Sequence, residues 1–171
     1  MIGLTHEQFE AASQYWNRKE KDVMPREALK QAVQAYIEAN NTCALATGTG
    51  DYVRCTPIEY SFHDGKFWMF SEGGEKFIGL EKNKNVCLSI YDKYDGFGNL
   101  KSLQVMGKAE IIEPFSDAYN AHAEIKHIPL DALKKLESPM HLICVTPEKI
   151  EVLNSEFKKE GYSIRQTYVV S

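Results

Sequence analysis

The chain has few cysteines, and none of them is arranged as a metal or redox motif. Four cysteines occur in 171 residues, and no two of them form a Cys-x-x-Cys pair. Such pairs are the usual signature of a structural zinc site or a dithiol redox centre, so neither is expected. Each cysteine lies in an apolar stretch, which predicts reduced thiols packed in the core: Cys43, Cys55, Cys87 and Cys144.

Positive charge and long apolar runs are also scarce. The 20 Lys and Arg residues are outnumbered by 24 Asp and Glu residues, which gives a net charge of −4 with no block of like charges. Nucleic acid and anionic membranes recognise a basic surface. No apolar run approaches the ~18 residues of a membrane helix, and residues 1–22 lack the basic start and apolar core of a secretory signal. We therefore expect a soluble, cytoplasmic protein that binds neither nucleic acid nor a membrane.

Several common catalytic motifs are missing as well. No Gly-x-Ser-x-Gly elbow occurs, and the glycine pairs within residues 48–50 and 96–98 lack the third glycine and following helix of a dinucleotide fingerprint. The five histidines do not form a metal pattern, since His122 and His127 fall on different faces of one helix. A histidine within residues 120–141 stays a candidate contact for haem or a substrate.

The chain has the size and composition of one domain, because 43% of its residues are hydrophobic and can form a substantial core. We expect a single domain over residues 1–171. It would comprise helices in residues 1–40, a barrel in residues 41–153 and a tail in residues 154–171.

Helix signals stand at both ends of this domain. Thr5 and Gln8 have the spacing of a capping box, Pro25 suits the first position of a second helix, and Ser116 and Pro129 mark two later helix starts. The apolar residues after Pro25 recur at helical spacing, so they are expected to share one buried face: Leu29, Val33, Tyr36 and Ile37.

Six segments have the composition and alternation of strands: residues 42–47, 52–62, 66–71, 86–91, 100–113 and 141–154. Short glycine-containing turns separate the first three, which predicts an antiparallel meander. Gly107 marks a bulge in the fifth segment, and Pro147 is expected to interrupt the sixth. Closely spaced strands with flanking helices predict a mainly β, α+β protein built on a small barrel.

The stretch FWMFSEGGEKF, residues 67–77, ends a strand abruptly at two glycines. A phosphate monoester near neutral pH carries almost two negative charges, and it is bound by cations, hydroxyls and the free N–H groups of a helix start. Ser71 offers a hydroxyl, Gly73 and Gly74 allow close approach of the backbone, and Lys76 and Arg54 supply positive charge. Two interpretations stay open here, a phosphate-binding turn and an ordinary strand-to-helix turn with a solvated lysine.

A short helix is predicted over residues 75–83, after the two glycines. Its apolar side chains are expected to face inward: Phe77, Ile78 and Leu80.

The order of these features is more informative than any one of them. A helix, the strands and the SEGGEKF turn within residues 43–92, and then LQVMGKAEII resemble the pyridoxamine 5′-phosphate oxidase-like family of FMN-binding split barrels. The resemblance covers roughly residues 35–113. It implies a six-stranded Greek-key split barrel that forms a homodimer, with FMN held in two clefts at the interface.

The resemblance also assigns cofactor-binding positions. The second strand would lie along the flavin, the turn after the third strand would bind the phosphate through Lys76, and Gln104 would hydrogen-bond the isoalloxazine edge. The full set implied for FMN is Arg54, Cys55, Thr56, Pro57, Phe70, Ser71, Gly74, Glu75, Lys76 and Gln104.

The chain also departs from the pattern of the family's oxidases. Glu75 replaces an arginine that often precedes the phosphate-binding lysine, and a carboxylate beside a phosphate is unfavourable unless it points away or pairs with Arg54. Glu59 stands where the oxidases keep a lysine near the flavin. The C-terminal Arg-x-His signature for the vitamin phosphate is absent, and the tail has Arg165-Gln166 instead. Oxidation of pyridoxamine phosphate is therefore not expected.

The leading hypothesis is an FMN-dependent oxidoreductase whose substrate is unidentified. FMN would exchange electrons with a reduced nicotinamide or another small organic donor, with no side chain required as acid or base. The alternative is a stress or storage protein that binds flavin or haem without turnover, because the same residues serve both roles. The deazaflavin F420 is disfavoured because its polyglutamate tail needs more positive charge.

Overall fold

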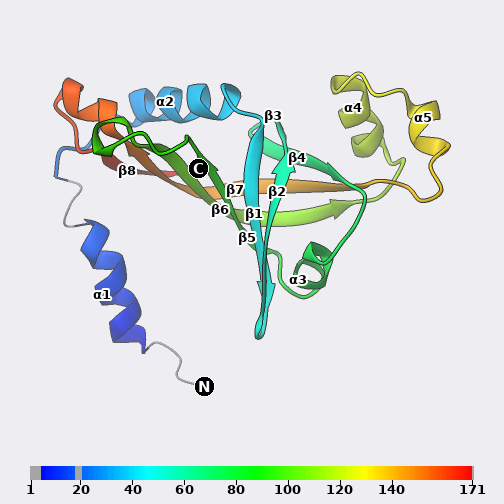
Figure 1. Ribbon diagram of the computed structural model, residues 1–171, viewed down its shortest axis with the longest axis horizontal. Helices are drawn as coiled ribbons and strands as arrows, with labels where there is room; N and C mark the ends of the chain where they lie inside the picture. The colour runs from blue at the N-terminus through cyan, green and yellow to red at the C-terminus, as the bar shows by residue number, and fades with distance from the viewer. Residues whose placement is uncertain (1–4, 18–20, 171) are drawn as a thin grey trace.

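The computed structural model describes residues 5–17 and 21–170, and an antiparallel sheet curled into a half-barrel forms its centre (Figure 1). Within these residues the strand order is β2-β1-β5-β6-β7-β4-β3, with β8 paired to β7. The strands are β1 (Thr42–Thr49), β2 (Tyr52–Glu59), β3 (Ser61–His63), β4 (Lys66–Ser71), β5 (Asn85–Tyr91), β6 (Lys101–Ile112), β7 (His141–Asn154) and β8 (Arg165–Val169). This architecture confirms the predicted split barrel with flanking helices.

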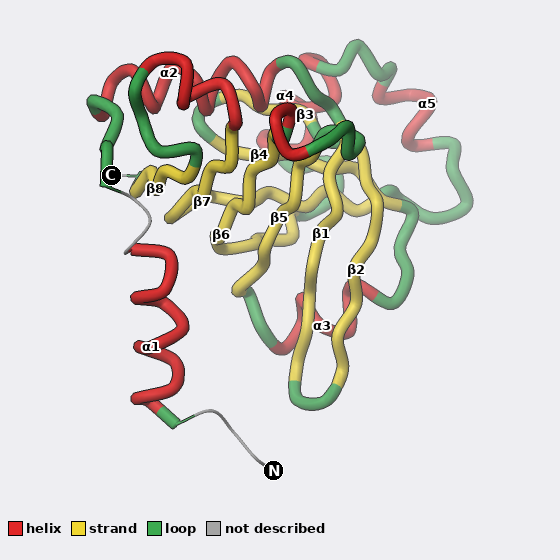
Figure 2. Tube along the Cα trace, turned by 60° about the vertical axis from the view of Figure 1, so that its left-hand side comes forward, coloured by secondary structure: helices red, strands yellow, loops and turns green. Residues whose placement is uncertain are grey.

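The helices lie around the sheet, and Figures 1 and 2 both show α2 across one side of it. The α4 and α5 helices gather at the far end, and α3 lies beside the β1–β2 hairpin. Their bounds are α1 (His6–Asn17), α2 (Arg26–Glu38), α3 (Lys76–Lys82), α4 (Asp117–Ile125) and α5 (Leu130–Lys134), with 3-10 turns η1 (Phe97–Asn99) and η2 (Ser155–Glu160). None of these helices is long and apolar enough to cross a membrane.

The core is built from alternate residues of the strands. Leu45, Phe67, Leu88, Val105 and Val145 are all fully buried, one on each of five strands. Because successive strand residues point to opposite faces, this alternation buries one face of the curled sheet against itself and α2. A second, smaller cluster lies beneath α4 and α5 and contains Tyr119, Ala123, Leu133 and Leu142.

The predicted helix starts are confirmed in detail. The Thr5 backbone N–H donates to Gln8 Oε1 over 3.0 Å, and the Gln8 N–H donates to Thr5 Oγ1 over 3.2 Å, which is the reciprocal pattern of a capping box. The Ser116 hydroxyl accepts from the Tyr119 N–H at the start of α4. Pro25 is the N-cap of α2, one position earlier than predicted, and Leu29, Val33 and Ile37 are buried as expected, whereas Tyr36 is only partly buried.

The predicted three-stranded meander is wrong. β4 pairs with β3 and β7 rather than with β2. The predicted strand over residues 52–62 breaks at Tyr60, which is buried and whose hydroxyl donates to the Ile37 carbonyl over 2.7 Å. That contact with the end of α2 turns the chain, so the short β3 starts a separate hairpin with β4.

Two further differences concern the C-terminal half. β7 continues through Pro147, but its register on β6 shifts there: Met106 pairs with Lys149 and Gly107 with Pro147, so Glu148 of β7 is the extra residue. A Cβ at Gly107 would lie 2.4 Å from the Thr146 carbonyl oxygen, so β6 needs glycine at this step, although the bulged residue lies in β7 and not in β6 as predicted. The predicted tail contains η2 and β8, so the described residues form eight strands where six were predicted.

The prediction of four core thiols is wrong for one cysteine. Cys43 and Cys144 are buried, and burial raises the pKa of these thiols to about 12 and about 11. Cys87 is partly buried, whereas Cys55 is exposed. The exception arises because β2 is the terminal strand of the sheet, so its outward side chains are not covered.

Candidate functional site

The turn between β4 and α3 is an open backbone cradle, made of residues 71–76. Gly73 has a φ of 136° and Gly74 a φ of 102°, conformations that favour glycine. A Cβ at Gly73 would meet nothing within 4 Å, and one at Gly74 would meet only the Lys76 ammonium at 3.5 Å. The space beside both glycines is therefore open for a bound group, and the lysine nitrogen borders it at Gly74.

Lys76 is an unusual lysine, because only 7% of it is exposed. Its ammonium donates to the Gly73 carbonyl. Burial, and after it the positive charge of Arg54, lowers the pKa of Lys76 below its ordinary value. The two cations thus lie close enough to repel each other, and an anion placed between them would relieve that repulsion.

Arg54 reaches this turn from β2, but it already has an anionic partner. Its Nη1 lies 2.8 Å from Glu75 Oε2, and the Tyr52 hydroxyl donates to the same oxygen over 3.2 Å. Half of the Arg54 side chain and more of Glu75 are exposed, and a pair of this kind contributes only about 0–1 kcal/mol to folding. A stronger ligand of the guanidinium could therefore displace the carboxylate.

Ser71 forms the other wall of the cradle, at the end of β4. It is almost fully buried, its hydroxyl accepts from the Gly73 N–H over 3.2 Å, and it lies 3.2 Å from the Gly73 carbonyl oxygen as a donor. These bonds fold the turn back onto the strand. The hydroxyl consequently faces the same loop as the Lys76 ammonium.

The packing of α3 on β1 fixes the cradle relative to Arg54. In the β1–β2 register Thr47 lies opposite Arg54, and Gly79 of α3 sits directly over β1. A Cβ at Gly79 would lie 2.9 Å from the Gly48 nitrogen and 3.1 Å from Thr47 Cβ. The Asn83 side chain donates to the Gly48 carbonyl over 3.0 Å. This close approach brings Lys76 and Arg54 together although 21 residues separate them.

Two predictions about α3 are wrong. Leu80 is buried as expected, but half of Ile78 is exposed, because the helix contacts the sheet through Gly79 rather than through Ile78. The N–H groups of the first turn are also less available than predicted. The Phe77 N–H donates to the Gly74 carbonyl over 3.2 Å, and the Ile78 N–H donates to the Glu75 carbonyl over 3.1 Å.

The other implied residues of β2 divide between its two faces. Thr56 lies two residues after Arg54 and therefore on the same face, whereas Cys55 and Pro57 point to the opposite face. Glu59, at the end of this strand, pairs with Lys126 over 2.6 Å. Within one chain, only Arg54 and Thr56 of the implied β2 residues point toward the side where α3 packs.

Gln104 lies on the far face from the cradle. The strand registers place Cys55, Ala46, Cys87 and Met106 in one row across four strands, so these residues share a face. Gln104 lies two residues before Met106 on β6 and is exposed on that same face. One chain therefore does not bring Gln104 to Arg54 and Lys76.

Phe70 is separated from the cradle as well. It alternates with Ser71 along β4, and its ring lies 5.2 Å from the Tyr119 ring and 5.1 Å from the His122 ring. These contacts place the side chain under α4. Its implied role beside a flavin has no support in the contacts of this chain.

Two residues near the cradle were not predicted from the sequence. His141 lies opposite Ser71 in the β4–β7 register, and its ring is 4.5 Å from the Phe77 ring. Tyr52 holds the Glu75 carboxylate. The sequence carries no signal for His141, because β4 and β7 are distant in the chain and their pairing was not expected.

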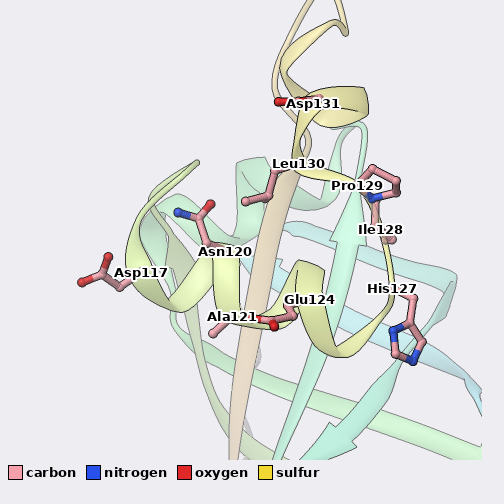
Figure 3. Close-up of a pocket in the computed structure, with 9 residues that line it drawn as sticks. All are labelled: Asp117, Asn120, Ala121, Glu124, His127, Ile128, Pro129, Leu130 and Asp131. Atoms are coloured by element: carbon pink, nitrogen blue, oxygen red, sulfur yellow. The ribbon is translucent and has the colours of Figure 1, made fainter.

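A different cavity, of about 700 Å³, lies between α4 and α5 (Figure 3). Its lining includes three carboxylates, Asp117, Glu124 and Asp131, together with His127. None of the implied cofactor residues lines it. An anionic ligand would be repelled by these carboxylates, so the β4–α3 turn is the better candidate for a phosphate.

Comparisons with known proteins agree with this fold. A family model described as pyridoxamine 5′-phosphate oxidase matches residues 29–154. A Listeria innocua protein named for that oxidase is 22% identical, with a TM-score of 0.57 over 74% of this chain and 98% of its own. No curated protein sequence matches.

Two other solved structures bind different groups according to their names. A FAD-binding protein of Mesorhizobium loti is 18% identical, with a TM-score of 0.57 over 71% of this chain and 89% of its own. The haem storage protein HutZ of Vibrio cholerae is 16% identical, with a TM-score of 0.57 over 70% of this chain and 90% of its own. At these identities the likeness shows the fold alone.

Proposed function

The chain belongs to the pyridoxamine 5′-phosphate oxidase family, and we propose that it is a homodimeric flavoprotein that binds FMN and uses it for oxidoreduction. The observation that carries this proposal is the convergence of Arg54 and Lys76 on the β4–α3 turn. A buried lysine with a lowered pKa beside a guanidinium, a serine hydroxyl and two open glycines fits a phosphate monoester.

Different residues of this chain would contact different parts of FMN. Lys76, Arg54 and Ser71 would hold the phosphate, while Thr56 would lie along the same face of β2. Bound FMN would supply two-electron chemistry at its isoalloxazine ring. The protein would position that ring and limit its contact with water.

A second copy of the chain would complete the site, because Gln104 lies on the opposite face of the sheet from the cradle. That face carries small side chains, including Ala44, Ala46 and Ser89, and it ends at the edge strand β2. A two-fold partner packed there could bring the partner's Gln104 to the flavin ring. Light scattering of the FMN-bound protein tests this proposal, since a monomer would contradict it.

Oxidation of a vitamin phosphate is not part of the proposal. Gln166 stands in the region of the missing Arg-x-His signature, and its side chain is 2% exposed. It accepts from the Met24 N–H and donates to the carbonyls of Asp22 and Ser163. It therefore fixes the segment before α2 rather than binding a substrate. The proposed electron donor is a reduced nicotinamide or another small organic molecule.

A non-catalytic carrier of flavin or haem is the second candidate. It is supported by the shared fold with a FAD-binding protein and a haem storage protein, and by a cradle whose two cations suit a carboxylate as well as a phosphate. The absorption spectrum between 300 and 500 nm distinguishes flavin from haem. Anaerobic addition of NADH or NADPH to the flavin-loaded protein then separates the two functions. Rapid bleaching supports the oxidoreductase, whereas an inert flavin supports the carrier.

A further inference from the structure

We propose that Glu75 is a specificity-determining residue that competes with the ligand phosphate for Arg54 and weakens the discrimination between phosphorylated and non-phosphorylated flavin. This inference rests on the proposed flavin function. In this proposal the Glu75 carboxylate supplies to Arg54 part of the negative charge that a bound phosphate would supply.

The Glu75 carboxylate is held by two donors from β2. Both Arg54 and Tyr52 donate to one and the same oxygen, Glu75 Oε2, at 2.8 and 3.2 Å. The two donors come from the same face of β2, two residues apart. Glu75 is thus held at the position where an anionic ligand of Arg54 would bind.

The two cations, Arg54 and Lys76, have different partners. Arg54 has a carboxylate partner, whereas the Lys76 ammonium is bonded to the Gly73 carbonyl, and no carboxylate among the described residues pairs with it. Arg54 and Lys76 contribute two positive charges, and Glu75 removes one of them. The three side chains of Arg54, Lys76 and Glu75 therefore have a net charge of +1, which matches a singly charged ligand better than a phosphate dianion.

Binding of a dianion then requires a rearrangement. The phosphate must either displace Glu75 from Arg54 or accept a negative charge beside its own oxygens, and both lower the affinity for FMN. Riboflavin has no phosphate, so its binding does not involve this exchange. The effect of Glu75 should consequently appear in the ratio of the two affinities and not in the affinity for riboflavin.

The test is titration of FMN and riboflavin into the full chain and its Glu75→Gln variant, followed by flavin fluorescence at low ionic strength. Glu75→Gln keeps the size of the side chain and removes its charge, so FMN should bind about tenfold more tightly while riboflavin is unchanged. Glu81→Gln is the matched control, because Glu81 is an exposed carboxylate at the other end of α3. It should leave both affinities within about twofold of the starting protein.

Two further measurements strengthen the test. The gain from Glu75→Gln should shrink in about 1 M salt, where charges are screened within about 3 Å. Tyr52→Phe removes one donor from the carboxylate without changing the charge, so it should tighten FMN by a smaller factor, about twofold to threefold.

The possible outcomes separate the two proposals. If Glu75→Gln binds FMN no more tightly than the starting protein does, the role of Glu75 is overturned and the flavin function is left intact. Failure of every variant to bind FMN or riboflavin at millimolar concentration overturns the flavin function, and the role of Glu75 with it.

Discussion

His63 Nε2 lies 3.0 Å from His122 Nδ1, a contact that joins the end of β3 to α4. The indole of Trp68 stacks on both imidazoles, with ring centroids 5.0 and 5.4 Å away. His63 also lies 3.1 Å from the Asp64 carboxylate through its other nitrogen. One shared proton must lie between the two imidazoles, so the pair is stable as long as His122 stays neutral.

The first prediction is that acid destabilises the protein through this pair. Burial first, and then the charges of His63 and Lys126, lower the pKa of His122 to about 4, while Glu59 acts in the opposite direction. An unfolded histidine titrates near 6.5, so between pH 6.5 and 4 the unfolded chain binds a proton that the folded chain excludes. The free energy of unfolding should fall by roughly 1.4 kcal/mol per pH unit in this window and be insensitive to His122 above it.

Urea unfolding at pH 7.5, 5.5 and 4.5 measures this effect. His122→Phe, which keeps an aromatic ring in the cluster, should abolish most of the extra pH dependence relative to the starting protein. Equal slopes in the two proteins would show that His122 does not remain neutral in the fold.

A second prediction concerns the contact between α3 and β1. Gly79→Ala would place a Cβ 2.9 Å from the Gly48 nitrogen, so α3 must shift and the fold should lose about 1–3 kcal/mol of stability. The shift would also move Lys76 away from Arg54. Gly98→Ala is the matched control, because a Cβ there meets nothing within 4 Å. Thermal unfolding of both variants, with FMN titration, measures the two effects, and a Gly79→Ala variant as stable as the control would contradict the packing argument.

A third prediction concerns the anchor of the segment before α2. Gln166→Ala leaves the buried Met24 N–H and two partly buried carbonyls without their partner, which should cost about 2–3 kcal/mol. Gln34 provides the control, since its side chain lies on the exposed face of α2 and its amide donates to Glu38 Oε1 over 2.8 Å. Denaturant unfolding should separate Gln166→Ala from Gln34→Ala by at least 1 kcal/mol, and equal stabilities would refute the anchoring role.

Local chemistry made much of this fold predictable. The capping box at Thr5 and the cap at Ser116 depend on residues close in sequence, and both are found where expected. The pairing of β4 with β7 was missed because it joins segments about 75 residues apart. The break at Tyr60 was missed because its cause is a hydrogen bond to α2.

In the candidate site, too, contiguous residues were predictable from the sequence and contacts between distant segments were not. Gly73, Gly74 and Lys76 are contiguous, so their turn could be recognised, and the doubt about Glu75 and Arg54 anticipated the ion pair between them. The exposure of Ile78 could not be anticipated, because it depends on how closely Gly79 approaches β1. The separation of Gln104 from the cradle follows from the register of four strands, which no local pattern encodes.

The most direct test of the account is the affinity for FMN after removal of either cation of the cradle. Arg54→Ala and Lys76→Ala should each weaken FMN binding by about tenfold or more, while riboflavin binding changes little and Lys82→Ala, at the exposed end of α3, has no effect. FMN affinities that are the same in all four proteins would contradict a phosphate site at the β4–α3 turn.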